Sequence, residues 1–547
     1  MPISFSNVPA NWRMPLYWVE VDPSMAGLPI VKQPALLVGT MRTADLVIGT
    51  APNEITYKAG VAQPDIPKPI GTQASADKEF GEGSELANMF RAFFANNFAH
   101  EVWGLPIAEP AGAAAASGTV EVTSPPTEAG SVFLYVAGHN VTTNVGPSDT
   151  VDTIASAMAE NINKDRSMPV TAAAATGTVT LTCKTKGVLG NDIDVRANYY
   201  GRIGGQEYPP GLMLQFGTDA SATSIKLTGG SGPPDFKPAI ANIGSIEFEY
   251  VALPWTDSQT LDDWEMEYGF SDTGRWGWMR QQFGHIFCAK RDTHSNLIVW
   301  GNPVNGASPN AGTISVLAVE PGAPSPVYEW CCAYAAKAAR ALVNDPARPL
   351  QTLSLNKVLP ARADDRFLIS ELNSLSGNGI ATQRTGSNND PMIMRETTTY
   401  QLNLYSQSDD AYELVTTLAT LAKLLRNQRH VITTKFPRHK LANDGTRFGI
   451  GQAIVTPKVV RAELVAQYRI DEFNGLVEDV GAFKDHLLVE RDPNDHNRIN
   501  VLYPPDLVNQ LRVFAVLAQF RLQYNRGQDL EVSTTLGTGT FQATGGI

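Results

Sequence analysis

Residues 111–118 read AGAAAASG and residues 228–234 read TGGSGPP, and these two stretches decide how the chain is organised. Runs of small residues, and of glycine with proline, are typical of connections between folded units. Between them, from Thr119 to about Leu227, short alternating strands surround one predicted helix. Outside them the sequence has a different pattern, of buried strands and amphipathic helices. The segment 111–228 is therefore predicted to be a small α+β domain inserted into a larger one.

Three strands and one helix are expected inside this insert. The strands Thr119–Thr123, Val132–Val136 and Val179–Cys183 alternate apolar and polar residues. The helix is predicted from apolar residues that share one face, namely Val151, Ile154, Met158 and Ile162. Because an insertion at a surface loop leaves the parent core undisturbed, the insert is expected to face outward.

The flanking stretches predict a discontinuous core, made of residues 31–110 and 229–378 and followed by a C-terminal domain at 379–510. Ala35–Val38 is a buried-type strand, a helix begins at Ser84, and Val102–Ile107 is a second strand. The fold class is therefore mixed α/β and multidomain. Later strands are expected at Ile246–Leu253, His285–Lys290 and Leu297–Trp300, and later helices at Leu261–Tyr268, Val327–Val343, Asp365–Leu375 with Gly377 as its cap, and Tyr412–Arg429.

Both ends of the chain are predicted to be extended arms, at residues 1–30 and 511–547. Each contains one stretch rich in aromatic and β-branched residues, Leu16–Asp22 and Leu511–Tyr524, which predicts a strand. A helix is the alternative for the second stretch, which is apolar on both faces at its start. These strands either join the chain's own sheet or add to a neighbour's sheet, and the second interpretation is preferred. The residues assigned to the arms are Leu16, Tyr17, Trp18, Val19, Val21, Phe514, Val516, Phe520, Leu522 and Tyr524. The Thr- and Gly-rich tail at 525–547 has little to bury.

The composition narrows the class of protein. The chain has 547 residues, more than one hydrophobic core usually supports, and a formal net charge of −12. Phosphate binding requires a basic field, so nucleic acid is not expected as a direct partner. Four cysteines fit no disulfide framework and favour a reducing cytoplasm. The N-terminal residues indicate no secretory signal, and no apolar run is long enough to insert into a membrane.

No convincing catalytic, metal or phosphate motif is present, so no enzyme activity, cofactor or metal is expected. Gly229–Gly232 precedes two prolines instead of a helix, which favours a linker over a phosphate loop. His100–Glu101 has no second histidine one helical turn later, as a zinc site on a helix would need. Cys331 and Cys332 point about 100° apart on a helix, which favours core packing beside neighbouring tyrosines over chelation.

Two acidic stretches have structural interpretations that compete with functional ones. The run DDWEME at 262–267 could supply paired carboxylates for acid–base chemistry, but an acidic first turn of a helix is the more common arrangement. The stretch DPND at 492–495 resembles part of a calcium loop. It lacks the glycine and the distal glutamate of such a loop, which favours a surface turn.

From Lys423 to Lys440 the chain carries six basic residues and no acidic one. One interpretation is a solvated basic face. The other is an electrostatic docking surface for an acidic partner. The six residues are Lys423, Arg426, Arg429, Lys435, Arg438 and Lys440.

The stretch Ser374–Leu404, SLSGNGIATQRTGSNNDPMIMRETTTYQLNL, resembles the contractile tail sheath proteins of Mu-like bacteriophages. In that family a Gly-Ile-Ala/Ser-Thr turn leads through a hairpin into an Arg-x-x-Thr-Thr-Tyr strand, and here these are Gly379–Thr382 and Arg395–Tyr400. The resemblance covers nearly the whole chain outside the insert, in matching order, and the tail after Tyr524 departs from it. Three further stretches agree: Ile3-Ser4-Phe5 with Val8-Pro9 and Pro15-Leu16, DDRFLIS at Asp364–Ser370, and RVFAVLAQFRLQY at the closing arm.

The resemblance implies a structural subunit of a myovirus virion. Such subunits stack as hexameric rings around a tail tube, in a helical assembly that contracts and drives the tube through the host envelope for DNA ejection. The implied partners are further copies of the chain, the tail tube protein, and the baseplate and tail terminator proteins, with assembly in the host cytoplasm. Domain 379–510 would be proximal to the tube, the basic residues would face the tube or a neighbouring subunit, and strand exchange by the arms would link the rings.

Two alternatives remain open from the sequence. The first is the sheath of a bacterial contractile injection system or of a phage-tail-like bacteriocin. The second belongs to a different class, a cytosolic enzyme or carbohydrate-binding protein with a β-rich accessory domain.

Overall fold

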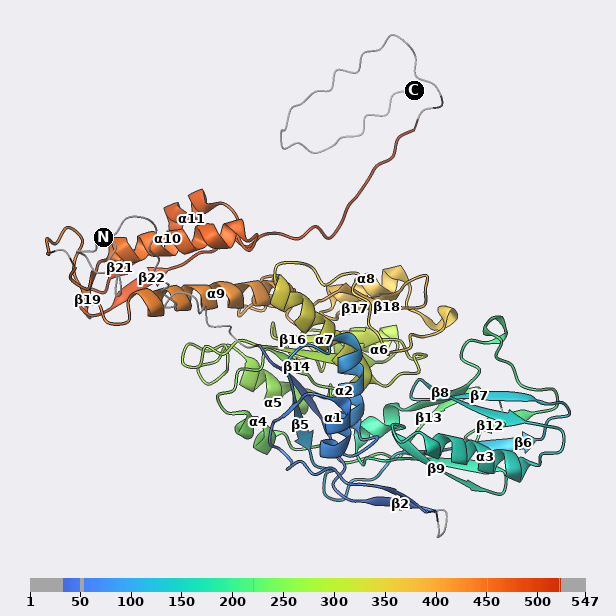
Figure 1. Ribbon diagram of the computed structural model, residues 1–547. Coiled ribbons are helices and arrows are strands. Elements are labelled where there is room, and N and C mark those ends of the chain that lie inside the picture. Colours follow the sequence, from blue (N-terminus) through green and yellow to red (C-terminus); the bar gives the residue numbers. More distant parts are fainter. Residues whose placement is uncertain (1–32, 50–53, 220, 450, 521, 523–547) are drawn as a thin grey trace, which may run out of the picture. The chain divides into compact units, whose positions relative to one another are not determined.

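The computed structural model describes residues 33–49, 54–219, 221–449, 451–520 and 522 (Figure 1). The chain falls into two units, residues 1–508 and residues 509–547. Three hydrophobic clusters stabilise the described part of the larger unit. One cluster lies around a central sheet, one lies within the insert, and one lies among helices near the end of the unit.

The central sheet has six strands in the order β16-β15-β14-β1-β5-β4. Five of them run parallel, and β4 is antiparallel to β5. Strand β1 (ALLVGT) is buried at every position, as expected for a parallel strand covered on both faces. The strands are β1 Ala35–Thr40, β4 Lys68–Ile70, β5 Val102–Ile107, β14 Tyr250–Ala252, β15 His285–Arg291 and β16 Ile314–Val319.

Helix α7 (Val327–Asn344) packs against β1, β14, β15 and β16 and also against α2 (Glu85–Asn96). It is buried on most of its circumference, as expected for a helix that is apolar nearly all round. Helix α2 is capped by Ser84, whose hydroxyl accepts a hydrogen bond from the N–H of Ala87. The other helices of this part are α1 Gln73–Phe80, α4 Lys237–Ile243, α5 Ser258–Tyr268, α6 His294–Trp300 and α8 Ile369–Gly377.

Residues 111–228 form two antiparallel four-stranded sheets, ordered β12-β6-β10-β9 and β13-β11-β7-β8, with their own hydrophobic cluster. Helix α3 (Val151–Lys164) packs on strands of both sheets. It begins with a capping box between Thr150 and Thr153. The strands are β6 Ser117–Ser124, β7 Gly130–Val136, β8 His139–Val145, β9 Val170–Ala175, β10 Thr178–Cys183, β11 Asp194–Ala197, β12 Met213–Phe216 and β13 Ser224–Lys226.

The remaining elements are mostly helices and small two-stranded sheets. The rings of Tyr468 and Phe483 stack at 3.8 Å in the third cluster and join two of these helices. The helices are α9 Val415–Lys435, α10 Pro457–Phe473 and α11 Val480–His486. The paired strands are β2 Leu46–Ile48 with β3 Ile55–Tyr57, β17 Thr382–Thr385 with β18 Pro391–Arg395, β19 Lys440–Leu441 with β20 Ile454–Val455, and β21 Leu488–Arg491 with β22 Ile499–Leu502.

The strand predicted at Leu297–Trp300 is wrong, because these residues end helix α6. Thr293 caps the helix by accepting a hydrogen bond from the N–H of Asn296. Leu297 and Trp300, three positions apart, are buried, whereas Val299 is 69% exposed. A run of four apolar residues fits one helical face as well as it fits a strand.

Other predicted elements are displaced along the chain. The strand predicted at Ile246–Leu253 pairs only over β14. The helix predicted at Asp365–Leu375 begins at Ile369, and the left-handed glycine after it is Gly379 and not Gly377. The hydrophobic pattern located both elements, but backbone pairing and capping set their ends.

Two expectations for particular stretches also need correction. The strand expected at Arg395–Tyr400 stops at Arg395, because the following threonines bond to the core instead: the carbonyl of Thr397 accepts a hydrogen bond from Ser315 at 2.7 Å. The acidic run 262–267 is not the first turn of its helix. Helix α5 begins at Ser258 behind the cap Asp257, so the acidic residues lie in later turns.

Candidate assembly site

The described residues of the second unit, 509–520 and 522, form neither helix nor strand (Figure 1). The strand predicted at Leu511–Tyr524 is therefore not formed over residues 511–520 of the single chain. The exposed fraction is 82% at Phe514, 68% at Val516, 84% at Phe520 and 97% at Leu522. An exposed apolar row of this length is typical of a surface that a partner covers.

The other residues assigned to the arms lie outside the described residues, so their role stays a prediction. They are Tyr524 at the C-terminal end and Leu16, Tyr17, Trp18, Val19 and Val21 at the N-terminal end.

The hairpin β21–β22 offers open sheet edges. Its strands pair with each other over their whole length and with no other described strand. The carboxylate of Asp492 accepts hydrogen bonds from two N–H groups of the connecting turn, which confirms the surface turn predicted for DPND. Leu488 and Leu502 are 58% and 59% exposed. A two-stranded hairpin is marginally stable alone, and its free edges can accept a further strand.

The six basic residues between Lys423 and Lys440 separate into two groups. Arg426, Arg429 and Lys435 bond to their own chain, with Lys435 in an ion pair with Glu463 and Arg429 donating to the carbonyl of Gln281 at 3.3 Å. The second group is exposed, as Arg429 and Lys435 also are, and it forms no ion pair among the described residues. It consists of Lys423, Arg438 and Lys440, the last of which donates to the side chain of Gln452 at 3.0 Å.

Arg426 is unsuited to a docking surface because it is buried against two carboxylates. Its side chain is 10% exposed and donates to Glu247 at 2.6 Å and to Glu249 at 2.9 Å. Burial opposes the charge of Arg426, but the two carboxylates outweigh it and raise its pKa. Burial raises the pKa of Glu249 even beside this partner. The assignment of Arg426 to a partner-facing patch is therefore corrected: it fastens α9 to the chain segment before β14.

A second cluster joins the insert to the central sheet. The carboxylate of Asp192, in the insert, accepts hydrogen bonds from Arg291 at 2.6 Å and from the N–H of Val327 at 2.7 Å. Arg291 is buried, and it also donates to the carbonyl of Ser325. Val327 begins α7, whose own cap position holds Pro326 and forms no side-chain bond. Asp192 therefore supplies the negative charge and the acceptor that this helix terminus needs.

Two further buried groups tie the insert to the core. The hydroxyl of Thr185 donates to the carboxylate of Glu85 at 3.0 Å, and burial raises the pKa of Glu85 from 4.5 to about 7. The amine of Lys184 donates to the carbonyl of Arg166 at 3.0 Å and lies 3.9 Å from the ring centroid of Tyr57. Burial lowers the pKa of Lys184 from 10.5 to about 7. The junction is therefore closed and hydrogen-bonded.

Glu85 is expected to make the free energy of unfolding fall as the pH rises from about 4.5 to about 7. In this window the folded chain holds a proton on Glu85 that the unfolded chain has released, so the contribution is complete below pH 4.5 and is lost as the pH passes 7. Glu85→Gln keeps an acceptor for Thr185 and should reduce the fall by ~3 kcal/mol. Urea unfolding of both proteins at pH 4.5 and pH 8 measures how far the free energy of unfolding falls between the two pH values. An equal fall in the wild type and in Glu85→Gln would contradict the prediction.

Two family models match this chain. The phage tail sheath protein central domain matches residues 229–399, and the phage tail sheath C-terminal domain matches residues 407–521. The Mu-like prophage FluMu tail sheath protein of Haemophilus influenzae is 40% identical over 524 residues, which cover 95% of this chain and 100% of that protein. The chain belongs to the phage tail sheath family. Tail sheath proteins are structural components of the phage tail and not enzymes, which excludes the alternative from a different class.

Two solved structures are also similar to this chain. The sheath tail protein of Desulfitobacterium hafniense has a TM-score of 0.43 and 11% identity, over 90% of this chain and all of that one. A chain of the anti-feeding prophage baseplate in the contracted state has a TM-score of 0.43 and 11% identity, over 94% of this chain and all of that one.

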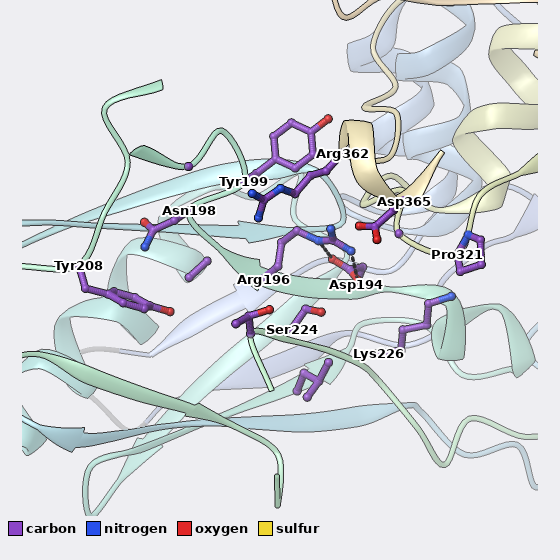
Figure 2. Close-up of a pocket in the computed structure, with 15 residues that line it drawn as sticks. Asp194, Arg196, Asn198, Tyr199, Tyr208, Ser224, Lys226, Pro321, Arg362 and Asp365 are labelled. Atoms are coloured by element: carbon purple, nitrogen blue, oxygen red, sulfur yellow. Dashed lines mark hydrogen bonds and ion pairs between the residues drawn. The ribbon is translucent and has the colours of Figure 1, made fainter. Parts of the chain in front are cut away.

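A cleft of about 680 Å³ lies beside the junction of the sheath protein's insert with its core (Figure 2). On one side Arg196 donates to Asp194 at 2.5 and 2.8 Å, and Lys226 stands on the neighbouring strand. Arg362 and Asp365 reach into it from the core side. Because charges of both signs line the cleft in similar number, it favours neither an anion nor a cation strongly.

The candidates for metal and thiol chemistry have structural positions in the sheath protein. Cys331 and Cys332 are fully buried in the core, which confirms the predicted packing role. In the part of the chain that the structure describes, no group of three or more His, Cys, Asp or Glu side chains is placed to hold a metal ion. Within the same residues, no helix combines the length and the apolar character needed to cross a bilayer.

Two features of the assembly site were not predicted from the sequence. Asp192 is 99 and 135 residues away from its two partners, so no local pattern reveals its role. The hairpin β21–β22 does have a signal, because the turn stretch DPND separates the alternating stretches LVER and INVL.

Proposed function

We propose that this sheath protein polymerises as stacked hexameric rings around the tail tube and contracts to drive the tube through the host envelope for genome delivery. The observation that carries the proposal is the presence, in one chain, of an exposed apolar C-terminal segment and a hairpin with open edges. Each is incomplete alone. A second copy of the chain would complete both.

The proposed link between copies is the addition of a strand to a sheet. An extended segment gains a row of backbone hydrogen bonds and seats alternate side chains against the receiving sheet. Phe514, Val516 and Phe520 would cover apolar side chains such as Leu488 and Leu502, which are now exposed. The arm at Leu16–Val21 would act in the same way. Such links can persist while the folded cores rotate, and contraction then needs only a free-energy difference between two lattices of core contacts.

The orientation of the subunit forms part of the proposal. Residues 379–510 would lie next to the tube, with the exposed Lys423, Arg438 and Lys440 directed to the tube protein or to a neighbouring subunit. The insert would face outward. The baseplate and tail terminator proteins would bind the two ends of the sheath, which would assemble in the host cytoplasm.

Deleting residues 1–22 tests the proposal, because it removes the strand predicted in the N-terminal arm and keeps every described residue. The expected product is a folded protein with an unchanged circular dichroism spectrum that forms no long tubes in negative-stain micrographs. Deletion of 525–547 is the matched control for a terminal truncation outside the predicted strands. Normal tubes without residues 1–22 would contradict strand exchange by this arm. Failure of the full-length protein to assemble at any concentration would contradict polymerisation itself.

A further inference from the structure

The end of α5 and the loop between α5 and β15 hold apolar side chains in solvent. Met266 is 65% exposed, Phe270 46%, Trp278 71% and Met279 64%, and these four residues are called the Trp278 patch. Exposed tryptophan and methionine are enriched where proteins bind partners.

The frame below the Trp278 patch is rigid. Arg275, 1% exposed, donates to Glu267 at 2.7 Å and to the carbonyl of Ile246 at 2.7 Å. Arg280 also bonds to Glu267, at 2.8 and 2.9 Å. A Cβ on Gly277 would come within 2.1 Å of the carbonyl oxygen of Ser271, so the loop is wound as tightly as glycine permits. A side chain held by such a frame loses little entropy on binding, as expected of an interface anchor.

Carboxylates lie beside two residues of the Trp278 patch. The indole N–H of Trp278 donates to Asp272 at 3.0 Å, and Asp262 precedes Met266 by one helical turn on α5. Burial and the charge of Asp262 raise the pKa of Glu265. None of these carboxylates forms an ion pair with a described residue. Asp262, Asp263, Glu265 and Asp272 are called the acidic rim. A tryptophan face beside unpaired carboxylates suits a cationic side chain, which the ring and the carboxylates would both attract.

Cations without ion-pair partners follow the C-terminal end of α9. Arg438, Lys440, Arg447 and Lys458 are exposed and form no ion pair among the described residues, and these four are called the basic end. Arg429 is the residue of α9 that bonds to the loop, at Gln281, and the helix continues from there for six residues, about 9 Å, to its end at Lys435. Among the described residues, no hydrogen bond or ion pair joins the basic end to the acidic rim.

We propose that the Trp278 patch and acidic rim of one subunit receive the basic end of a second copy. This inference rests on the proposed polymerisation and adds a contact that neither arm provides. The two surfaces differ and lie apart on the same chain, so their contact between copies is heterologous, the type that generates rings or helical lattices. Opposite charges on the two surfaces would also fix the register of neighbouring subunits.

Trp278→Ala is expected to raise the protein concentration needed for assembly about tenfold or more, since central tryptophans dominate interface energies. Met213→Ala, which truncates a 63% exposed side chain in the insert, is the matched control and should assemble as the wild type does. Both are measured by sedimentation of purified protein without tube protein, after circular dichroism has established that they are folded. Unchanged assembly of Trp278→Ala would overturn the anchor.

A charge exchange tests the identity of the partner. Asp262→Lys with Asp263→Lys, and separately Arg438→Glu with Lys440→Glu, should each raise the assembly concentration, and all four changes in one chain should restore it. Failure of the combined variant to recover would overturn the contact between copies, and the tube would then be the partner of the basic end. If the lysine variants do not fold, Asp262→Asn with Asp263→Asn gives the same direction of effect. Loss of assembly in the wild type as well would instead overturn polymerisation.

Discussion

Asp192→Ala is expected to lower the free energy of unfolding by about 3–5 kcal/mol, because removing one partner leaves the buried Arg291 without its carboxylate. The same change leaves the first N–H of α7 without its acceptor. Arg291 is 2% exposed and cannot turn to water without moving the end of β15. Urea unfolding at pH 7, followed by circular dichroism, measures the loss.

Two variants separate the contributions of Asp192. Asp192→Asn keeps an acceptor for the N–H of Val327 but not the negative charge, so its loss should fall between those of the wild type and the alanine variant. Glu160→Ala, which truncates a 69% exposed carboxylate of the insert, should change the stability by less than about 0.5 kcal/mol. A loss below about 1 kcal/mol for Asp192→Ala would mean that the junction does not depend on this ion pair.

Arg426→Met is expected to cost a similar amount, about 3–5 kcal/mol at pH 8, because it leaves two carboxylates packed together without a cation. Glu249 is the more deeply buried of the two, and burial already raises its pKa. Its protonation becomes favourable in the variant, so the loss should shrink as the pH falls toward 5. A pH series of urea unfolding measures both effects.

Arg438→Met is the matched control for this change. It alters the same residue type at an exposed position without an ion-pair partner among the described residues, so its effect on stability should stay below about 0.5 kcal/mol at both pH values. An equal loss of stability in Arg426→Met and Arg438→Met would mean that the effect comes from the change in overall charge and not from the buried ion pairs.

The central fold follows from sequence patterns where the apolar runs have clear ends. Helix α7 was predicted within one residue, because Asn344-Asp345-Pro346 stops a long apolar helix. Both ends of strand β5 agree with the predicted strand Val102–Ile107. Helix α10 was missed although its buried residues Val460, Leu464 and Tyr468 recur every four positions behind a proline at the first turn.

The assembly site was only partly open to prediction. The composition predicts an apolar segment at each end of the chain. The exposed apolar residues of the C-terminal segment agree with this prediction. The sequence could not predict which basic residues remain available to a partner. Arg426, for example, bonds to Glu249, which lies 177 residues away in the sequence. The exposure of Trp278 could not be predicted either. It depends on arginine hydrogen bonds and on close glycine contacts that exist only in the folded loop.

The attachment of the insert through Asp192 sets a rule for engineering this protein. A foreign sequence grafted in place of residues 111–228 would take away the cap of the main core helix and expose Arg291. A peptide tag placed instead in the β9–β10 turn, where Thr176 faces solvent, would leave that cap in position. Particles that display cargo should therefore be built by extending the insert at this turn and not by exchanging it.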